Sequence, residues 1–101
     1  MSTRYQLVLQ FPEWFINLDS LVALEDELIA SLDDADVDGH DVGSGEANIF
    51  LFTESPQRTF SVIRDLLNED QLKNVKAAYT TPESDDYTIL WPSDLTEFDV
   101  K

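Results

Sequence analysis

Apolar and polar residues alternate along residues 5–11 (YQLVLQF), which predicts a half-buried strand that ends at Pro12. The same two-residue period predicts a strand over residues 46–53 (EANIFLFT), with Phe50 and Phe52 on the face opposite Ile49 and Leu51. A short strand before it, residues 35–42, would form a hairpin whose turn takes its positive-φ positions from Gly43 to Gly45. Two further strands are predicted in residues 74–80 (NVKAAYT) and 86–92 (DYTILWP).

A helical period appears in two segments. Residues 18–32 (LDSLVALEDELIASL) start after an N-cap at Asn17 or Asp19, and residues 55–68 (SPQRTFSVIRDLLN) start with Ser55 as N-cap and Pro56 at the first helical position. The apolar stripe of the first comprises Leu18, Leu21, Val22, Leu28, Ile29 and Leu32, with Leu24 on its shoulder. The stripe of the second comprises Phe60, Ile63, Leu66 and Leu67.

Glu25 interrupts the first stripe near its middle. Carboxylates are rarely fully buried, so the favoured interpretation moves the centre of the stripe toward Leu24 and leaves Glu25 at its edge in water. The alternative is a buried carboxylate with a dedicated partner, for which His40 is a candidate.

The element order is therefore β-α-β-β-α-β-β, which indicates an α+β fold. We expect a ferredoxin-like β-α-β-β-α-β unit with an additional C-terminal strand, its antiparallel sheet covered on one face by two helices. A length of 101 residues predicts a single domain over residues 1–101. Residues 93–101 are short and polar, and we interpret them as a flexible tail.

Charge is unevenly distributed. The net charge is −15, and the segment between Arg4 and Arg58 holds twelve carboxylates and no Lys or Arg. This argues against binding a nucleic-acid backbone or an anionic membrane, and permits a basic protein partner, divalent cations or mimicry of a polyanion. A surface that only confers solubility is the simpler explanation. The absence of cysteine excludes disulfides and thiolate metal sites. With no signal-peptide pattern and no long apolar stretch, we expect a cytoplasmic protein.

Aromatic residues suggest an interface. If helices cover Ile49 and Leu51, the rings of Phe50 and Phe52 face outward, and Tyr79, Tyr87 and Trp91 are candidates to join them. Such a face would favour self-association, for example a homodimer, or capture of a protein partner. The opposing interpretation is that the C-terminal residues Leu95 and Phe98 fold over these rings.

The segment DADVDG, with Asp34, Asp36 and Asp38, matches the opening of a calcium-binding EF-hand loop, but Gly45 stands where the closing glutamate belongs. We reject an EF-hand and keep these three residues as a weak metal-site alternative. The loop candidates for a functional site are Asp38, His40, Asp41, Ser44 and Glu46. A catalytic site would combine His40 with Asp38, Asp41 and Ser44, although a hairpin seldom gives triad geometry. An enzyme would use Glu25, His40 or Asp41. A structural hydrogen bond between His40 and a carboxylate is the favoured interpretation. No phosphate-binding loop is present, and no cofactor is expected.

The stretches DGHDVGSGEANIF (residues 38–50), DYTILWP (residues 86–92) and LVLQFP (residues 7–12) resemble a family of short, acidic bacterial proteins of unassigned function. The resemblance implies a single small bacterial domain and carries over no functional residues. Taken together, the sequence favours a non-enzymatic, acidic protein-binding module that acts on a basic partner or self-associates through its aromatic sheet face. The alternative is a regulatory domain that binds a small ligand or a divalent metal through residues 34–46.

Overall fold

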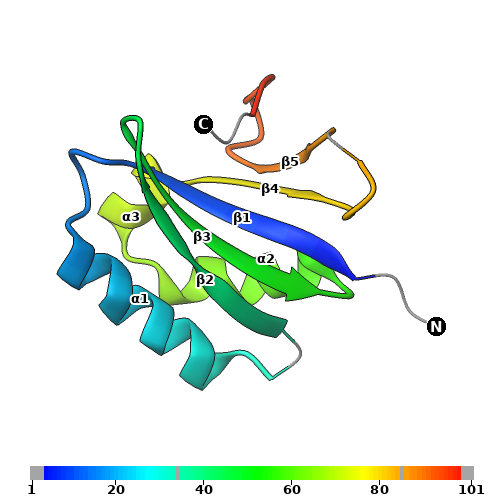
Figure 1. The fold of residues 1–101 in the computed structure, drawn as a ribbon, viewed down its shortest axis with the longest axis horizontal. Coiled ribbons are helices and arrows are strands. Elements are labelled where there is room, and N and C mark those ends of the chain that lie inside the picture. The colour runs from blue at the N-terminus through cyan, green and yellow to red at the C-terminus, as the bar shows by residue number, and fades with distance from the viewer. Residues whose placement is uncertain (1–3, 34, 85, 99–101) are drawn as a thin grey trace.

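The fold is an antiparallel sheet with helices packed on one side (Figure 1). The computed structural model describes residues 4–33, 35–84 and 86–98. Within them the elements are β1 (Tyr5–Pro12), α1 (Leu18–Ser31), β2 (Ala35–Gly43), β3 (Glu46–Thr53), α2 (Pro56–Leu66), α3 (Glu69–Asn74), β4 (Lys76–Thr80) and β5 (Thr88–Trp91). None of the described helices has the length and apolar character needed to cross a membrane.

The five strands lie in the order β2-β3-β1-β4-β5, and every neighbouring pair is antiparallel. The predicted α+β class and antiparallel sheet are therefore confirmed, as is the additional C-terminal strand, β5. The prediction of two helices is wrong, because α3 is a third. Its signal was present in the sequence: Asn68 and Gln71 form a capping box, in which each side chain accepts a hydrogen bond from the other residue's backbone N–H.

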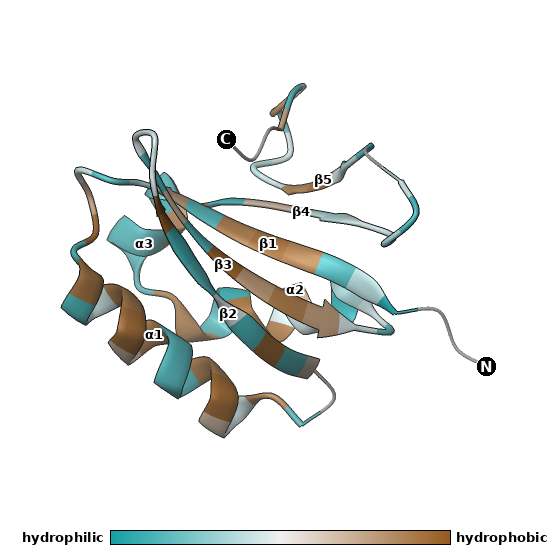
Figure 2. Ribbon diagram, viewed as in Figure 1, coloured by the Kyte–Doolittle hydropathy of each residue, from teal (hydrophilic) through white to brown (hydrophobic). Residues whose placement is uncertain are grey.

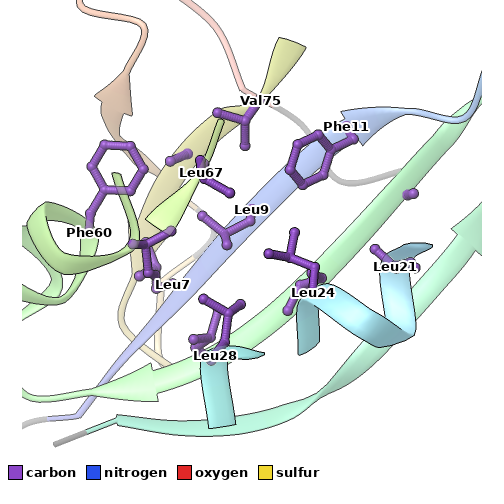
Figure 3. Packing of buried hydrophobic residues seen from close by; sticks show 14 of the residues in the cluster. Leu7, Leu9, Phe11, Leu21, Leu24, Leu28, Phe60, Leu67 and Val75 are labelled. Carbon is purple, nitrogen blue, oxygen red and sulfur yellow. The ribbon is translucent and has the colours of Figure 1, made fainter. Parts of the chain in front are cut away.

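The hydrophobic core lies between the sheet and the helices. Leu7, Leu9 and Phe11 point from β1 toward the leucines of α1, as Figure 3 shows, and Phe60 of α2 closes the core near β4. The prediction that β1 is half-buried is wrong, because Val8, on its opposite face, is also fully buried. The reason is position: β1 pairs with β3 on one side and with β4 on the other, so side chains of neighbouring strands flank it at both edges.

Helix α1 begins where expected, with the Asn17 side chain accepting a hydrogen bond from the Ser20 backbone N–H. Its buried side is narrower than predicted. Leu21, Leu24 and Leu28 are buried, whereas Leu18, Val22 and Ile29 are 56%, 37% and 59% exposed. The helix contacts β2, which is the last strand of the sheet, so nothing described lies beyond that strand to cover these three side chains.

The hairpin between β2 and β3 turns through two residues. Gly43 pairs with Glu46, and between them Ser44 and Gly45 have φ angles of 55° and 84°. Two consecutive positive φ angles match the twist of the strands, which is why this turn type is common in hairpins. The predicted hairpin is confirmed, but Ser44, rather than Gly43, supplies the first positive-φ position.

Candidate functional site

Glu25 of α1 and His40 of β2 form a hydrogen-bonded pair between the helix layer and the edge of the sheet. His40 Nδ1 lies 2.8 Å from Glu25 Oε1, and the side chains of His40 and Glu25 are 32% and 11% exposed. An ionised carboxylate can only accept hydrogen bonds, so the contact with an ionised Glu25 requires the His40 tautomer that carries its proton on Nδ1. The pair thus connects the middle of α1 directly to β2.

A bulge in β2 places His40 on the helix side. Val37 pairs with Leu51, but the register shifts at the next step, so that Gly39 pairs with Phe50 and His40 with Ile49. The extra residue, Asp38, interrupts the two-residue alternation of the strand. As a result His40 shares a face with Ile49 and the core, whereas Asp41 pairs with Asn48 and faces the opposite side, here called the outer face.

These positions decide between the two interpretations of Glu25. The expectation that Glu25 sits in water at the edge of the stripe is wrong, because its side chain is mostly buried. The alternative, a dedicated partner in His40, is confirmed. The buried side of α1 is centred nearer Leu24, as expected. Glu25 nevertheless lies beneath β2, where His40 contacts it.

The remaining loop candidates do not converge. Asp38 occupies the bulge, Asp41 lies on the outer face, and Ser44 stands in the turn. Glu46 begins β3, where it pairs with Gly43 and with Pro12. His40 is therefore separated from Asp41 by the sheet itself, although the two are neighbours in sequence.

The acidic residues at the start of β2 were the weak metal-site alternative. Asp36 forms an ion pair with Arg4, with 2.6 Å between its Oδ2 and the guanidinium nitrogen, and Asp34 lies outside the described residues. In the part of the chain that the structure describes, no group of three potential ligands from His, Cys, Asp and Glu comes together.

Phe50 and Phe52 lie on the outer face, as the alternation predicted. They pair with Val8 and Gln6 of β1, across from the residues that face the helices, and both are half-buried. The Arg4 guanidinium lies over the Phe52 ring, 5.8 Å from its centroid. Part of this face is therefore covered by the chain itself.

The other aromatic candidates are elsewhere. Tyr79 pairs with Leu7, and Trp91 pairs with Ala77, so both lie on the helix side of the sheet. Their inclusion in an outward aromatic face is wrong, and the reason is strand register, which the sequence pattern does not determine. Tyr87 packs its ring against Phe98, 5.1 Å between centroids. Figure 1 shows the described part of the C-terminal segment beside β4 and β5, not across β1 and β3.

Comparisons of the chain with protein-family models, with curated proteins and with solved structures gave no match.

Replacing Glu25 or His40 by alanine is expected to lower the free energy of unfolding by about 1–3 kcal/mol, because each change leaves a partly buried polar partner without its hydrogen bond. Urea titration of both single variants and of the double variant gives the coupling energy, expected at about 0.5–3 kcal/mol. Glu27→Ala, on the exposed side of α1, is the control and should change stability by less than about 0.5 kcal/mol. Additive effects of the two substitutions would contradict a direct Glu25–His40 contact.

Proposed function

We propose that the chain is a non-enzymatic, acidic protein-binding module that recognises a basic protein partner. The observation that supports this is the clustering of exposed carboxylates on two adjoining elements. They are Asp19, Asp26 and Glu27 of α1 and Asp36, Asp38 and Asp41 of β2. The segment that contains both elements has no Lys or Arg between Arg4 and Arg58, and Arg4 is already paired with Asp36.

Uncompensated charge of one sign produces a local potential that attracts ligands of the opposite sign and raises their association rate. A net charge of −15 on 101 residues makes this attraction strong at low ionic strength. His40 and Glu25 bind each other, and that contact gives the two most chemically distinctive side chains a structural task. The proposed binding role depends on the exposed carboxylates and does not require Glu25 or His40 to contact the partner.

The test is binding of a lysine-rich synthetic peptide, with a glutamate-rich peptide of the same length as the control. We expect the lysine-rich peptide to bind at about 0.01 M salt and to lose most of its affinity at about 1 M salt, because the screening length falls from about 30 Å to about 3 Å. Calorimetry or fluorescence anisotropy measures both affinities.

The location of the peptide-binding surface is tested with variants that remove carboxylate charges. Asp38→Asn combined with Asp41→Asn should weaken binding of the lysine-rich peptide, whereas Asp65→Asn combined with Glu83→Gln, elsewhere on the surface, should weaken it less. If the lysine-rich peptide does not bind at low salt, or if both double variants have equal effects, the proposed recognition by α1 and β2 is refuted.

We also infer that the first four strands follow a ferredoxin-like plan. Their order β2-β3-β1-β4, with α1 between β1 and β2 and α2 between β3 and β4, supports a split β-α-β arrangement. Helix α3 and strand β5 are additions to that plan.

Self-association through the outer face, which the sequence also permits, has weaker support. Only Phe50 and Phe52 of the five candidate aromatic residues are placed on that face by strand pairing, and Arg4 already lies over Phe52. A basic partner at the acidic elements is therefore the better-supported function.

A further inference from the structure

Strand β2 is an edge strand, and its outer edge, the one away from β3, pairs with nothing in the described residues. It runs over nine residues, Ala35–Gly43, and bonds only to β3. Every second backbone N–H and C=O group of such a strand points away from the sheet, and these groups are available to an added strand. Figure 1 shows this edge next to α1.

An apolar row on α1 lies beside that edge. Leu18, Val22 and Ile29 (the apolar row) are exposed, and at 100° per residue they fall within about 40° of one another on the helix. Figure 2 shows apolar bands along α1 beside a largely hydrophilic β2. Exposed apolar residues scattered singly need no explanation, but three on one stripe of one helix indicate a surface that something can cover.

The Glu25–His40 contact fixes how the row and the edge are oriented. On the helix, Glu25 lies between the buried leucines and the apolar row, and it points up to β2. The apolar row is the next position around the helix, so it points past β2, below the place where an added strand would run. Alternate side chains of that strand would then rest on the row, as those of β2 and β3 rest on the buried leucines.

The charges around this edge indicate which kind of segment can bind there. The apolar row is bordered by Asp19 and Asp26 on the helix, and β2 carries Asp36, Asp38 and Asp41, all exposed. A second copy of the chain would bring the same carboxylates against these, and like charges placed opposite one another disfavour that pairing. A segment with lysine or arginine between apolar residues matches both the row and the carboxylates.

We propose that the outer edge of β2 and the apolar row of α1 form a docking groove for an extended, basic segment of a partner protein, which adds to the sheet as a sixth strand. The segment has alternating character: apolar residues rest on Leu18, Val22 and Ile29, and lysine or arginine side chains on the other face lie near Asp41, while Asp36 stays paired with Arg4. This inference rests on the proposed function and gives it a binding mode, recognition by strand addition.

The probe is a synthetic peptide of alternating lysine and valine. The first control peptide has the same residues but carries N-methyl groups on the amides of one strand edge. The second control peptide has no N-methyl groups, and serine replaces valine. If the peptide adds as a strand, N-methylation removes the hydrogen bonds and should weaken binding at least about tenfold, while charge is unchanged. The amides of β2 should exchange with deuterium more slowly when the unmethylated peptide is bound.

Variants of the protein test the row. Val22→Ser combined with Ile29→Ser should weaken binding of the lysine–valine peptide about tenfold, because the peptide's valines lose their apolar contacts. Val62→Ser is the matched control, since Val62 is an exposed valine on α2, and it should leave the affinity unchanged. Each variant is expected to remain folded, because all three side chains are exposed in the native chain, and unfolding by urea checks this.

The outcomes separate the two proposals. Salt-sensitive binding that N-methylation and the α1 variants leave unchanged overturns the groove but keeps the acidic binding function. Absence of binding to any lysine-rich peptide overturns both. Sedimentation of the chain alone as a dimer that Ile29→Ser dissociates also overturns the groove, because a second copy then occupies it.

Discussion

Replacing Leu28 by alanine is expected to lower the free energy of unfolding by about 2–5 kcal/mol. Leu28 is fully buried on α1 and belongs to the same apolar cluster as Leu7 and Leu51, so its removal leaves a cavity between helix and sheet (Figure 3). A domain of this size has a stability of about 5–15 kcal/mol, so the loss is large. Urea titration followed by far-ultraviolet circular dichroism measures it.

The matched control is the next residue along the helix. Ile29→Ala removes a similar apolar volume in the same helix, but Ile29 is 59% exposed, so stability should change by no more than about 0.5 kcal/mol. Comparing Leu28→Ala with Ile29→Ala separates the loss of packing from the change in helix propensity, because both substitutions introduce alanine into the same helix. Equal losses for Leu28→Ala and Ile29→Ala would contradict the orientation of α1 on which the docking groove depends.

Replacing Trp91 by alanine is expected to cost about 2–4 kcal/mol and to release β5 from the sheet. The Trp91 indole N–H donates to the Leu72 carbonyl over 2.9 Å, its ring lies 6.4 Å from that of Phe60, and the Arg64 guanidinium stacks 5.2 Å from its centroid. One side chain thus joins the last strand to α2 and to α3. Amide hydrogen exchange should become faster in β5 before it does in β1.

Trp14 provides the control for Trp91. It lies between β1 and α1 with 80% of its surface exposed, so Trp14→Ala should leave stability within about 0.5 kcal/mol of the parent chain. Trp91→Phe keeps most of the apolar contact but loses the hydrogen bond to Leu72, and an intermediate loss is expected. Unchanged exchange in β5 of the Trp91→Ala chain would show that its four residues are held by strand pairing alone.

The sequence predicts where the helices and strands lie better than it predicts which of their side chains are buried. The alternation in β1 and β3 and the helical stripes report secondary structure directly, because side-chain period follows backbone geometry. Exposure depends on neighbours that are distant in sequence. Val8 is buried because β1 is central, and Ile29 is exposed because α1 lies under an edge strand; neither fact is contained in the local pattern.

The candidate site shows the same limit. A carboxylate within an apolar stripe identified Glu25 as unusual, and the single histidine was a natural partner for it. The pairing of Glu25 with His40 stood only as the alternative, because the choice among the carboxylates near His40 depends on the face of β2 that His40 occupies. That face is decided by one bulge, and bulges have no strong sequence signal besides the glycine at position 39.

The bulge at Asp38 and Gly39 has a consequence for how the chain can change in evolution. Side chains alternate along a strand, so a shift of one residue exchanges the two faces. Deletion of Asp38 would remove the extra residue and with it the bulge, and would leave Gly39 opposite Phe50 and His40 opposite Ile49. Regular pairing with Asp38 retained would instead turn His40 toward the outer face and Asp41 toward the core. Strand β2 can therefore lose one residue at the bulge and keep both of its faces, and related chains should include some that are one residue shorter there.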